Sequence, residues 1–304
     1  MKHVKRINRK NQMLRLAFDT DLPWGSKEHY FHALHGYLLP GLHHALTLGY
    51  RDIQFEDCGP LMQPRLYQGC MLAGLNAVEP DAPLTGDLYR VPRWDQCLLH
   101  FEAPPPSMSR IAAYCQRITP LVQKMTARAE SFEGGCVAGL RGNVPRVTNN
   151  FDVDTVAVIK RSEDHPFYHS PRMAAFPRYG VGRTDLLNAE EVAQTLCAQG
   201  IAAQVVEFGA MTLGEQITVA NRARALVGIR GAEFANVIWM RPNTHAIMLA
   251  TPVRENHGTR TLCAVKRVHF ASLPVDANHV QLDSSGQRAI VQLLSRGTVP
   301  EATT

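Results

Sequence analysis

The stretch Leu226-Val-Gly-Ile-Arg-Gly-Ala-Glu-Phe-Ala-Asn-Val-Ile-Trp-Met240 decides how the second half of this chain folds. Its first residues are part of an apolar run, Ala225 to Ile229, that predicts a buried parallel strand. After Gly231 comes an apolar segment, 232–240, that predicts a short helix ending before Pro242. A strand, a glycine turn and a helix N-terminus together present backbone N–H groups and a positive dipole end, which suit an anion.

Arg230 stands between Gly228 and Gly231 in this stretch, and a guanidinium has the geometry to hold phosphate oxygens. Nucleotide phosphates bind at such turns in many α/β proteins. Other α/β turns contain two glycines and bind nothing. The residues of the turn alone therefore leave both interpretations open.

Further motifs surround the turn at regular spacings. In chain order they are Val156-Ala-Val-Ile-Lys160-Arg161, Arg183 with Asn188-Ala-Glu-Glu191, Gly214-Glu215-Gln216, Gly228-Ile-Arg-Gly231-Ala232 with Asn236, and Pro242 before Ala246-Ile-Met-Leu249. A weaker similarity lies upstream in Tyr30-Phe-His32-Ala-Leu34 and Leu38-Leu-Pro40. In this order the chain resembles glycosyltransferase family 61, which contains plant xylosyltransferases, protein O-linked N-acetylglucosaminyltransferases and bacterial capsule enzymes. The resemblance covers roughly residues 28–40 and 156–252, with a longer insertion at 162–182.

The resemblance implies an α/β protein of the architecture called GT-B, in which two Rossmann-like domains with parallel sheets face each other across a cleft. It implies a nucleoside-diphosphate sugar donor, a UDP-sugar first among the candidates, held by the C-terminal domain, and a glycan or glycolipid acceptor on the N-terminal domain. The expected reaction is inverting and needs no metal or other cofactor. The residues expected to bind the nucleotide sugar are Lys160, Arg161, Arg183, Glu215, Gln216, Gly228, Arg230, Gly231, Ala232 and Asn236.

Three positions depart from the family pattern. The histidine before Gly-Ala is Arg230 here, the acidic residue near the end of the next strand is Met248, and the acidic position four residues after His32 is Gly36. Arginine does not release its proton in the useful pH range, so Arg230 cannot act as the base. The departures also admit a second interpretation, a catalytically inactive homologue that binds nucleotide sugar or glycan as a scaffold or regulator.

Two side chains are candidates for the base that takes a proton from the acceptor hydroxyl. Glu233 lies three residues after Arg230 at the same predicted helix mouth. His32 would come from the N-terminal half, and histidine is the side chain that titrates closest to neutral pH. Glu233 equally suits the dipole of a helix N-terminus, and His32, which neighbours His29 and His35, equally fits a packed histidine.

The other candidates have alternative roles as well. Lys160 and Arg161 either project into the same cleft as Arg230 and neutralise a diphosphate, or form a surface pair at a strand end. The Glu215-Gln216 pair either shapes the nucleotide pocket or begins a helix, where an acidic side chain is favourable. Asn236 is polar within an apolar segment, so a loop backbone or the ligand has to satisfy it if it is buried.

Two Asp-x-Asp strings, Asp19-Thr-Asp21 and Asp152-Val-Asp154, have carboxylates of the kind that bind divalent cations. Strings of this length arise often by chance, and both stand at predicted strand edges, where aspartate is a frequent turn residue. We expect no metal site.

Composition sets the outer limits. A chain of 304 residues fits two domains of about 150, which we place at 1–145 and 146–304, with the boundary in the Gly-, Asn- and Pro-rich stretch 134–150. With 45% hydrophobic and 19% charged residues it is a folded protein rather than a disordered one. Seven scattered cysteines without a Cys-x-x-Cys pair argue against a disulfide framework and a zinc site, and favour the cytoplasm.

The first ten residues are basic, and the net charge of the chain is +5. No apolar core follows them, so we expect no signal peptide, and no run reaches the roughly 20 residues that cross a bilayer. The basic decamer either contacts the inner face of a bacterial membrane or is a solvated terminus. An aromatic-interleaved basic patch is absent from the sequence, which argues against nucleic-acid binding.

Strand and helix patterns alternate along the chain, which predicts parallel sheets with helices on both faces. We expect strands at Met13–Phe18, Asp52–Glu56, Gln96–Phe101, Thr155–Ile159, Ala202–Val206, Ala225–Ile229 and His245–Ala250, and helices at 27–48, 109–130, 189–198, 213–223, 232–240 and 281–296.

Overall fold

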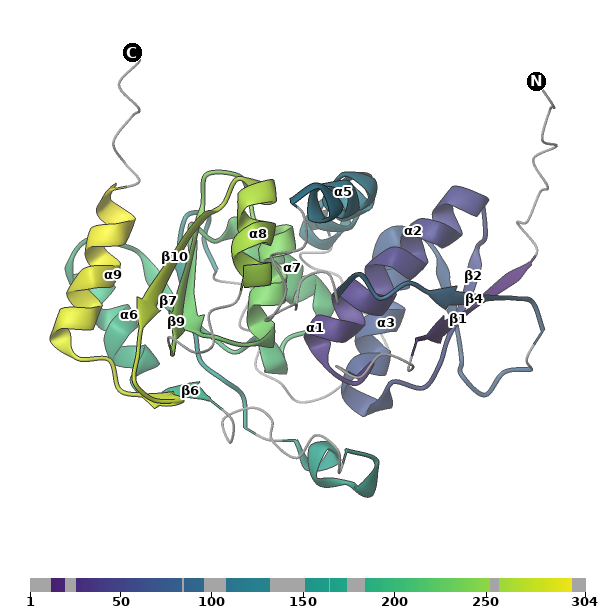
Figure 1. Ribbon diagram of the computed structural model, residues 1–304, viewed down its shortest axis with the longest axis horizontal. Helices are drawn as coiled ribbons and strands as arrows, with labels where there is room; N and C mark the ends of the chain where they lie inside the picture. Colours follow the sequence, from purple (N-terminus) through teal and green to yellow (C-terminus); the bar gives the residue numbers. More distant parts are fainter. Residues whose placement is uncertain are drawn as a thin grey trace, which may run out of the picture.

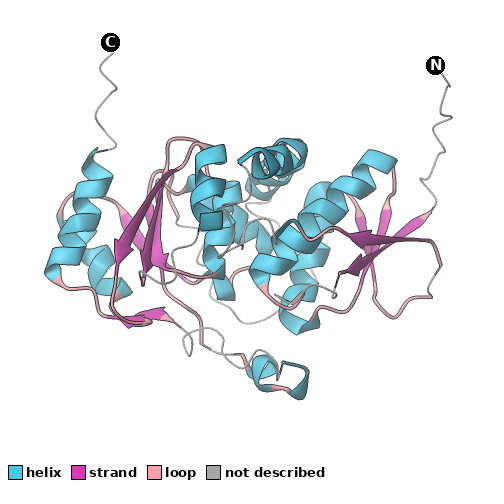
Figure 2. Ribbon diagram, in the orientation of Figure 1, coloured by secondary structure: helices cyan, strands magenta, loops and turns pink. Residues whose placement is uncertain are grey.

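The computed structural model describes residues 12–19, 26–83, 85–95, 108–131, 151–163, 165–173, 184–251 and 257–296. Within these ranges the chain is a mixed α/β protein with two main sheets, and every strand pairing is parallel. Figure 1 shows the two sheets toward opposite ends of the molecule. Figure 2 shows that most of the space between them is filled by helices.

The first sheet has the strand order β3-β2-β1-β4, so the direction of winding reverses between β1 and β4. Residues of β1 alternate between half-buried and buried, which leaves one face of this sheet partly exposed. Helices cover the other face on the side of the second half (Figure 1). The elements are β1 (Met13–Phe18), α1 (Tyr30–Ala33), the π-helical turn η1 (Leu34–Leu38), α2 (Leu39–Leu48), β2 (Asp52–Phe55), α3 (Gly59–Ala73), β3 (Asn76–Val78) and β4 (Asp87–Val91).

The second sheet has the order β10-β9-β8-β5-β7, and its winding reverses between β5 and β8. All five residues of β8 are buried, as expected for a strand covered by helices on both faces. The elements are β5 (Val156–Ile159), η3 (Pro166–His169), η4 (Pro171–Met173), α6 (Ala189–Ala198), β7 (Ala203–Val206), η6 (Phe208–Ala210), α7 (Leu213–Arg222), β8 (Ala225–Ile229), η7 (Ala232–Trp239), β9 (His245–Ala250), α8 (His257–Lys266), β10 (His269–Pro274) and α9 (Ser284–Arg296). A two-stranded sheet joins β6 (Asp185–Leu186) and β11 (His279–Val280).

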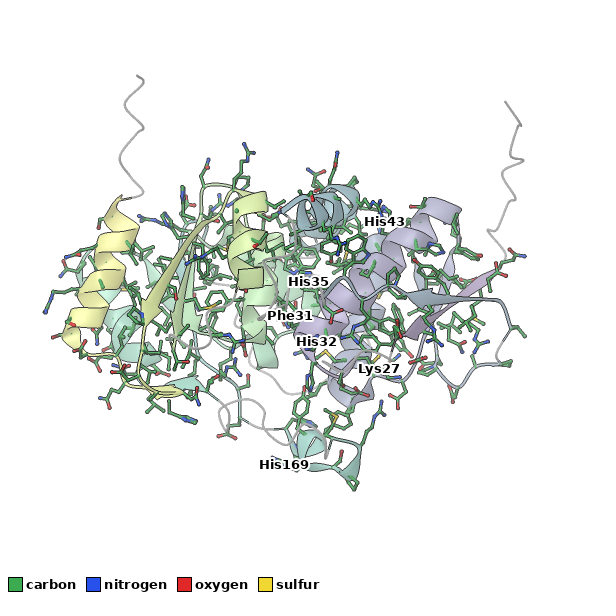
Figure 3. All side chains as sticks on the ribbon, in the orientation of Figure 1. Lys27, Phe31, His32, His35, His43 and His169 are labelled. Atoms are coloured by element: carbon green, nitrogen blue, oxygen red, sulfur yellow. The ribbon has the colours of Figure 1, made fainter. Side chains whose placement is uncertain are left out.

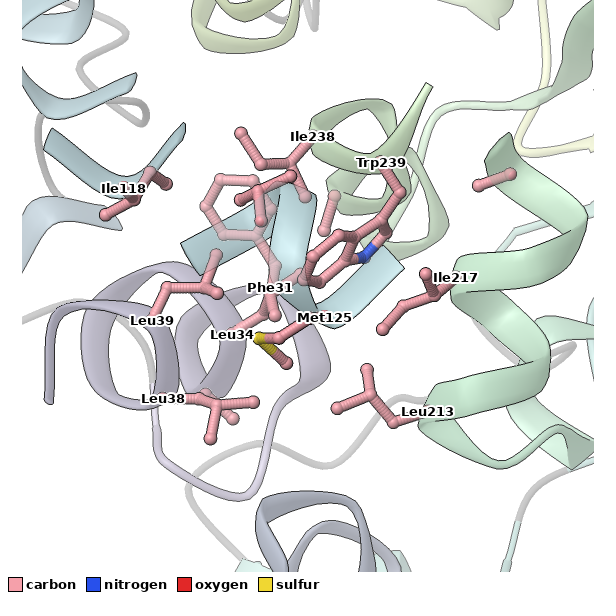
Figure 4. Close-up of a cluster of buried hydrophobic side chains, with 14 of the residues drawn as sticks. Phe31, Leu34, Leu38, Leu39, Ile118, Met125, Leu213, Ile217, Ile238 and Trp239 are labelled. Atoms are coloured by element: carbon pink, nitrogen blue, oxygen red, sulfur yellow. The ribbon is translucent and has the colours of Figure 1, made fainter. Parts of the chain in front are cut away.

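One hydrophobic core joins the two halves. The long helix α5 (Met108–Ser131) packs against α2 and α3 of the first half and against α7 and α8 of the second. In Figure 4, Phe31 and Leu38 from the first half meet Ile217 and Trp239 from the second around Met125 of α5. Each fully buried side chain of this size contributes roughly 1.5–3 kcal/mol, so the helical layers of the two halves are held together by apolar contact.

The segment Ala232–Trp239 forms a 3-10 helix rather than the α-helix that its apolar character suggests. Its residues from Phe234 to Trp239 are all buried, and it packs against α1, α7 and α8. Such long 3-10 helices are uncommon, so packing on several sides rather than local propensity fixes this one.

Most of the elements expected in the second half are present, with ends that differ by up to three residues from those predicted. The sequence patterns missed α3, β3, β4, α8 and β10. The expected strand Gln96–Phe101, the boundary at 134–150, Arg183 and the basic decamer lie outside the described residues. No helix among the described residues is long and apolar enough to span a membrane.

Candidate functional site

The switch point of the second sheet, between β5 and β8, lies where the sequence places its anion site. In open α/β sheets, ligands bind outside the carboxyl ends of the strands at the point where the winding reverses. Here β5 ends at Ile159 and runs on into Lys160 and Arg161, while β8 ends at Ile229 and runs on into Arg230. The topology therefore brings both predicted cationic segments to one edge of the sheet.

Arg161 lies across the turn that follows β8. Its side chain is only 7% exposed, and its Nη2 donates to Oε2 of Glu233 at 2.8 Å and to the carbonyl oxygen of Arg230 at 3.4 Å. A Cβ on Gly231 would lie 1.5 Å from this Nη2. Gly231 has extended backbone (φ −174°), so it is needed for the space that the guanidinium occupies rather than for an unusual turn conformation.

Gly228 also serves close packing, because it lies inside β8 and not in the turn. A Cβ at this position would come 2.8 Å from Cβ of Ile159 on the neighbouring strand. The two glycines of the deciding stretch thus act separately: Gly228 lets Ile159 pack over β8, and Gly231 admits Arg161.

Two buried polar atoms lie at the same edge of the sheet without a hydrogen-bond partner among the described residues. They are Nε of Arg161 and Oγ1 of Thr184, which precedes β6. Oγ of Ser162 also lacks a partner within the described ranges, but it lies against Gly209, which follows β7. Thr184 neighbours Asp185, whose Oδ1 accepts from the backbone N–H of Arg161 at 3.2 Å. Buried donors normally have acceptors, so an anion with several oxygens suits this group of atoms.

Lys160 points away from this group. Its Nζ donates to Oε1 of Glu190 on α6 at 2.8 Å, and both side chains are well exposed. The hydrogen bond to Glu190 is the main cause that raises the pKa of Lys160, and the same bond lowers the pKa of Glu190. Successive residues of an extended chain point to opposite sides, so Lys160 and Arg161 do not share a cleft.

The predicted polar residues Glu215, Gln216 and Asn236 all have partners within the protein. Glu215 forms a capping box with Thr212 at the start of α7, which satisfies the first backbone N–H groups of that helix. Asn236 is fully buried, and its Nδ2 donates to Oε1 of Gln216 at 3.2 Å. Its Oδ1 accepts from the hydroxyl of Tyr30 at 2.9 Å, so this side chain links η7 to the first half.

Two of the remaining candidates, Ala232 and Arg230, flank Gly231 and are half-buried. The backbone N–H of Arg230 extends the sheet by donating to the carbonyl oxygen of Leu249 at 2.8 Å. Met248, where the sequence resemblance leads one to expect an acidic residue, is fully buried in the shared core. An unpaired carboxylate there would be costly, so methionine suits its surroundings.

His32 lies on α1 in the first half, and the structure gives it a partner that the sequence did not indicate. Its Nδ1 is 2.7 Å from Oδ2 of Asp95, a fully buried carboxylate just after β4. Arg93 donates to both oxygens of that carboxylate, at 2.8 and 2.7 Å. In the sequence, Asp95 could have been noticed only through Arg93, which stands two residues before it and follows β4. The sequence patterns did not predict that strand.

His35 lies in the π-helical turn η1, which continues α1, and it is a packed histidine. It is fully buried, and burial lowers its pKa from 6.5 to about 4, so the ring is neutral. Its Nε2 donates to the carbonyl oxygen of Ala235 in η7 at 3.3 Å, and its Nδ1 accepts from the hydroxyl of Tyr114 at 3.2 Å. Together with the bond between Tyr30 and Asn236, this contact holds α1 against η7.

The arm formed by η3 and η4 reaches from the second half to the first. Arg172 pairs with Glu28 at 2.8 Å and with Asp57 at 2.5 Å, and the hydroxyl of Tyr168 donates to the carbonyl oxygen of Glu28 at 3.4 Å. Burial raises the pKa of Tyr168 to about 12; Arg65 opposes the rise, and Glu28 and Glu233 add to it. Tyr168 thus lies near acidic residues of both halves. In Figure 3, His169 of this arm lies at the lower edge of the molecule, below Lys27 and His32.

The Asp-x-Asp strings lie elsewhere or in part outside the described residues. Asp154 precedes β5 in a left-handed turn (φ 66°) and pairs with Arg241 at 2.6 Å, at the end of the strand opposite to Arg161. Asp21 lies outside the described ranges. No group of three potential metal ligands occurs among the residues that the structure describes.

Comparison with known proteins gives one finding about the chain as a whole. A family model described as Glycosyltransferase 61 matches residues 30–247. The match begins at α1 and ends within β9, so it includes His32, Arg161, Arg230 and Glu233. Among proteins of curated function, none matches the chain.

Proposed function

The chain belongs to glycosyltransferase family 61, and on that premise we propose that it moves a sugar from a nucleoside-diphosphate sugar to a glycan or glycolipid acceptor. Membership of the family implies a glycosyltransferase, and hence a sugar donor and an acceptor. The proposal adds a nucleotide donor bound at the β5–β8 edge, with UDP as the first nucleotide to test. It also adds a GT-B arrangement of two domains, and a reaction that inverts the sugar and uses no metal.

One observation carries the proposal: the buried Arg161 at the switch point of the second sheet. Its Nη2 is held by Glu233, while its Nε has no hydrogen-bond partner among the described residues. The pair with Glu233 satisfies one side of this guanidinium, whereas, within the described part of the chain, the buried Nε still lacks an acceptor, which a bound anion would supply. A diphosphate supplies several acceptor oxygens, and Arg230 and the first N–H groups of η7 lie at the same edge.

The same groups suit the chemistry of transfer. As the bond between the sugar and the diphosphate breaks, negative charge grows on the departing phosphate oxygen. Arg161 and Arg230 are fixed cations that stabilise this charge without a metal ion. The acceptor hydroxyl attacks the anomeric carbon from the opposite side of the sugar, and a base removes its proton.

Candidates for that base come from both halves of the chain. Glu233 belongs to the donor side, where its carboxylate already holds Arg161. His32 belongs to the first half, where we place the acceptor, in keeping with the GT-B arrangement. The contacts of Tyr30 and His35 with η7 hold the helix of His32 close to that of Glu233.

A screen of donors tests the proposal. The full chain is heated with UDP, GDP, CMP and dTDP sugars, and those that raise its melting temperature are followed by mass spectrometry for release of the nucleotide. A ligand present at 100 times its dissociation constant stabilises a protein by about 2.7 kcal/mol, which such a screen detects easily. We expect one class of donor to bind and to turn over. Binding without turnover favours the second candidate function, a non-catalytic homologue that binds a sugar nucleotide. The observation in favour of this candidate is that Arg230 stands where the family resemblance leads one to expect a histidine.

A further inference from the structure

Gly36 leaves room for a carboxylate that comes from another part of the chain. A Cβ built on Gly36 would lie 2.1 Å from Oδ1 of Asp95 and 2.6 Å from its Cγ. No larger residue fits at position 36 unless Asp95 moves. Gly36 has no positive φ that would require glycine, so the space for Asp95 is the reason that the structure offers for it.

The helix around Gly36 is also irregular. Residues Leu34–Leu38 form a π-helical turn between α1 and α2, and all five are buried. Single π-helical turns inside longer helices are rare and occur frequently at functional sites. His32 lies one turn before Gly36, so the irregular turn, the glycine and the histidine share one face of the helix.

Asp95 is held rigidly from the other side. Arg93 donates to both carboxylate oxygens, and its own side chain is 1% exposed. The guanidinium also donates to the carbonyl oxygen of Asp19, at 2.9 Å, and lies over the ring of Phe18. Burial raises the pKa of Asp95, but the hydrogen bonds from Arg93 and His32 outweigh it and hold the pKa below its usual value, so Asp95 stays ionised.

An ionised Asp95 fixes the tautomer of His32. A carboxylate only accepts hydrogen bonds, so Nδ1 of His32 carries the proton in the 2.7 Å contact with Asp95. In the neutral ring Nε2 is then the unprotonated nitrogen. No hydrogen bond among the described residues engages Nε2, and the side chain of His32 is 14% exposed.

We propose that Asp95 positions His32, and that the lack of a side chain at Gly36 leaves the space that the Asp95 carboxylate occupies. With Nδ1 held by Asp95, Nε2 of His32 serves as the base of the transfer. The inference rests on the proposed function. In the step, Nε2 takes the proton of the acceptor hydroxyl while the oxygen forms its bond to the anomeric carbon. The bond from that carbon to the phosphate oxygen breaks, and its electron pair leaves with the nucleoside diphosphate. His32 afterwards loses the proton to water.

A relocation of the carboxylate tests the role of Asp95. Asp95→Ala removes the positioning group, and we expect turnover to fall on the order of 10²-fold with little change in KM for the donor. Gly36→Asp in the same chain returns a carboxylate to the vacated space, one helical turn from His32 and next to Arg93. The double variant Gly36→Asp/Asp95→Ala should turn over at least about tenfold faster than Asp95→Ala. Gly36→Asp alone crowds two carboxylates together and should be worse than wild type.

A second readout does not depend on activity. Nitrogen chemical shifts of His32, assigned with a His32→Gln variant, report which ring nitrogen carries the proton. We expect protonated Nδ1 in the wild type and in the relocation variant, and a mixture in Asp95→Ala. Melting temperatures of all variants are compared, because a merely structural Asp95 would give losses of activity that follow stability and are not rescued by relocation.

The outcomes separate this inference from the proposed function. An active wild type with an equally active Asp95→Ala variant, or a proton on Nε2 of His32 in the wild type, would overturn the role of Asp95 while the glycosyltransferase proposal stands. A wild type that turns over no donor would overturn the proposed function and the base role of His32 with it. Loss on Asp95→Ala, rescue by relocation and protonated Nδ1 together support the inference.

Discussion

The most informative perturbation removes the cation at the β5–β8 edge without leaving a buried charge behind. Arg161→Gln alone strands Glu233, whose side chain is 17% exposed in its pair with Arg161. Breaking a buried pair costs about 3–5 kcal/mol, and the partial exposure of Glu233 reduces this to about 2–3 kcal/mol. Arg161→Gln/Glu233→Gln removes both charges and should recover most of that stability, so its binding can be measured on a folded protein.

The double variant should lose affinity for the diphosphate and not for the nucleoside. Arg161 would supply at least one charge-assisted hydrogen bond to phosphate, worth about 1.5–3 kcal/mol, which corresponds to an affinity about 10- to 150-fold weaker. Isothermal titration with the nucleoside diphosphate and with the bare nucleoside separates the two parts of the ligand. The nucleoside should bind both proteins within about twofold.

Lys160→Gln is the matched control for Arg161→Gln, because it removes the same single charge from the adjacent residue. Lys160 pairs with Glu190 on the surface, so its loss should change stability and affinity by less than about 1 kcal/mol. Equal losses of diphosphate affinity for Lys160→Gln and for the single variant Arg161→Gln would mean that only the general positive charge matters. Unchanged diphosphate affinity in the double variant would refute the assignment of Arg161.

Three further results are expected. Arg230→Ala should weaken diphosphate binding by about 1.5–3 kcal/mol, and equal weakening for the bare nucleoside would show that Arg230 supports the fold instead. Donor binding and turnover should survive EDTA; complete loss that manganese restores would contradict a metal-independent site. Because burial lowers the pKa of His35 from 6.5 to about 4, its neutral ring stabilises the fold fully above pH 6.5, and this contribution is lost as the pH falls toward 4. Urea unfolding at pH 7 and 4.5 should show that His35→Asn removes about 2–3 kcal/mol of this pH dependence, and an unchanged dependence would contradict the burial argument.

The centre of the second sheet was predictable because β5, β8 and β9 are short apolar runs that are buried, whereas its half-buried edge strand β10 was missed. Ala225–Ile229 and His245–Ala250 were predicted with the ends that the structure gives them. The first half was harder, because β3 and β4 lie at the edges of its sheet and expose residues such as Leu88, which is 64% exposed. A strand of that kind has neither a continuous apolar run nor a regular alternation.

The candidate site was predictable only where it follows from strand ends. Arg161 and Arg230 could be placed together because parallel strands end at one edge of the sheet. Successive side chains of an extended chain point to opposite sides, so the side chain of Lys160 lies on the other side, next to Glu190. Asp95 could not be found in this way, since its partner His32 lies 63 residues away and no local spacing connects them. The link between Tyr30 and Asn236 spans 206 residues and depends on how the two halves pack.

The central claim is that a nucleoside diphosphate binds at the C-terminal edge of β5 and β8. A crystal structure of the full chain with a bound nucleoside diphosphate tests this most directly. We predict diphosphate oxygens within hydrogen-bonding distance of the Arg161 guanidinium, beside Gly231 and the first turn of η7. A diphosphate bound at another place, such as the β1–β4 edge near Arg93, with Arg161 still held only by Glu233, would contradict the claim.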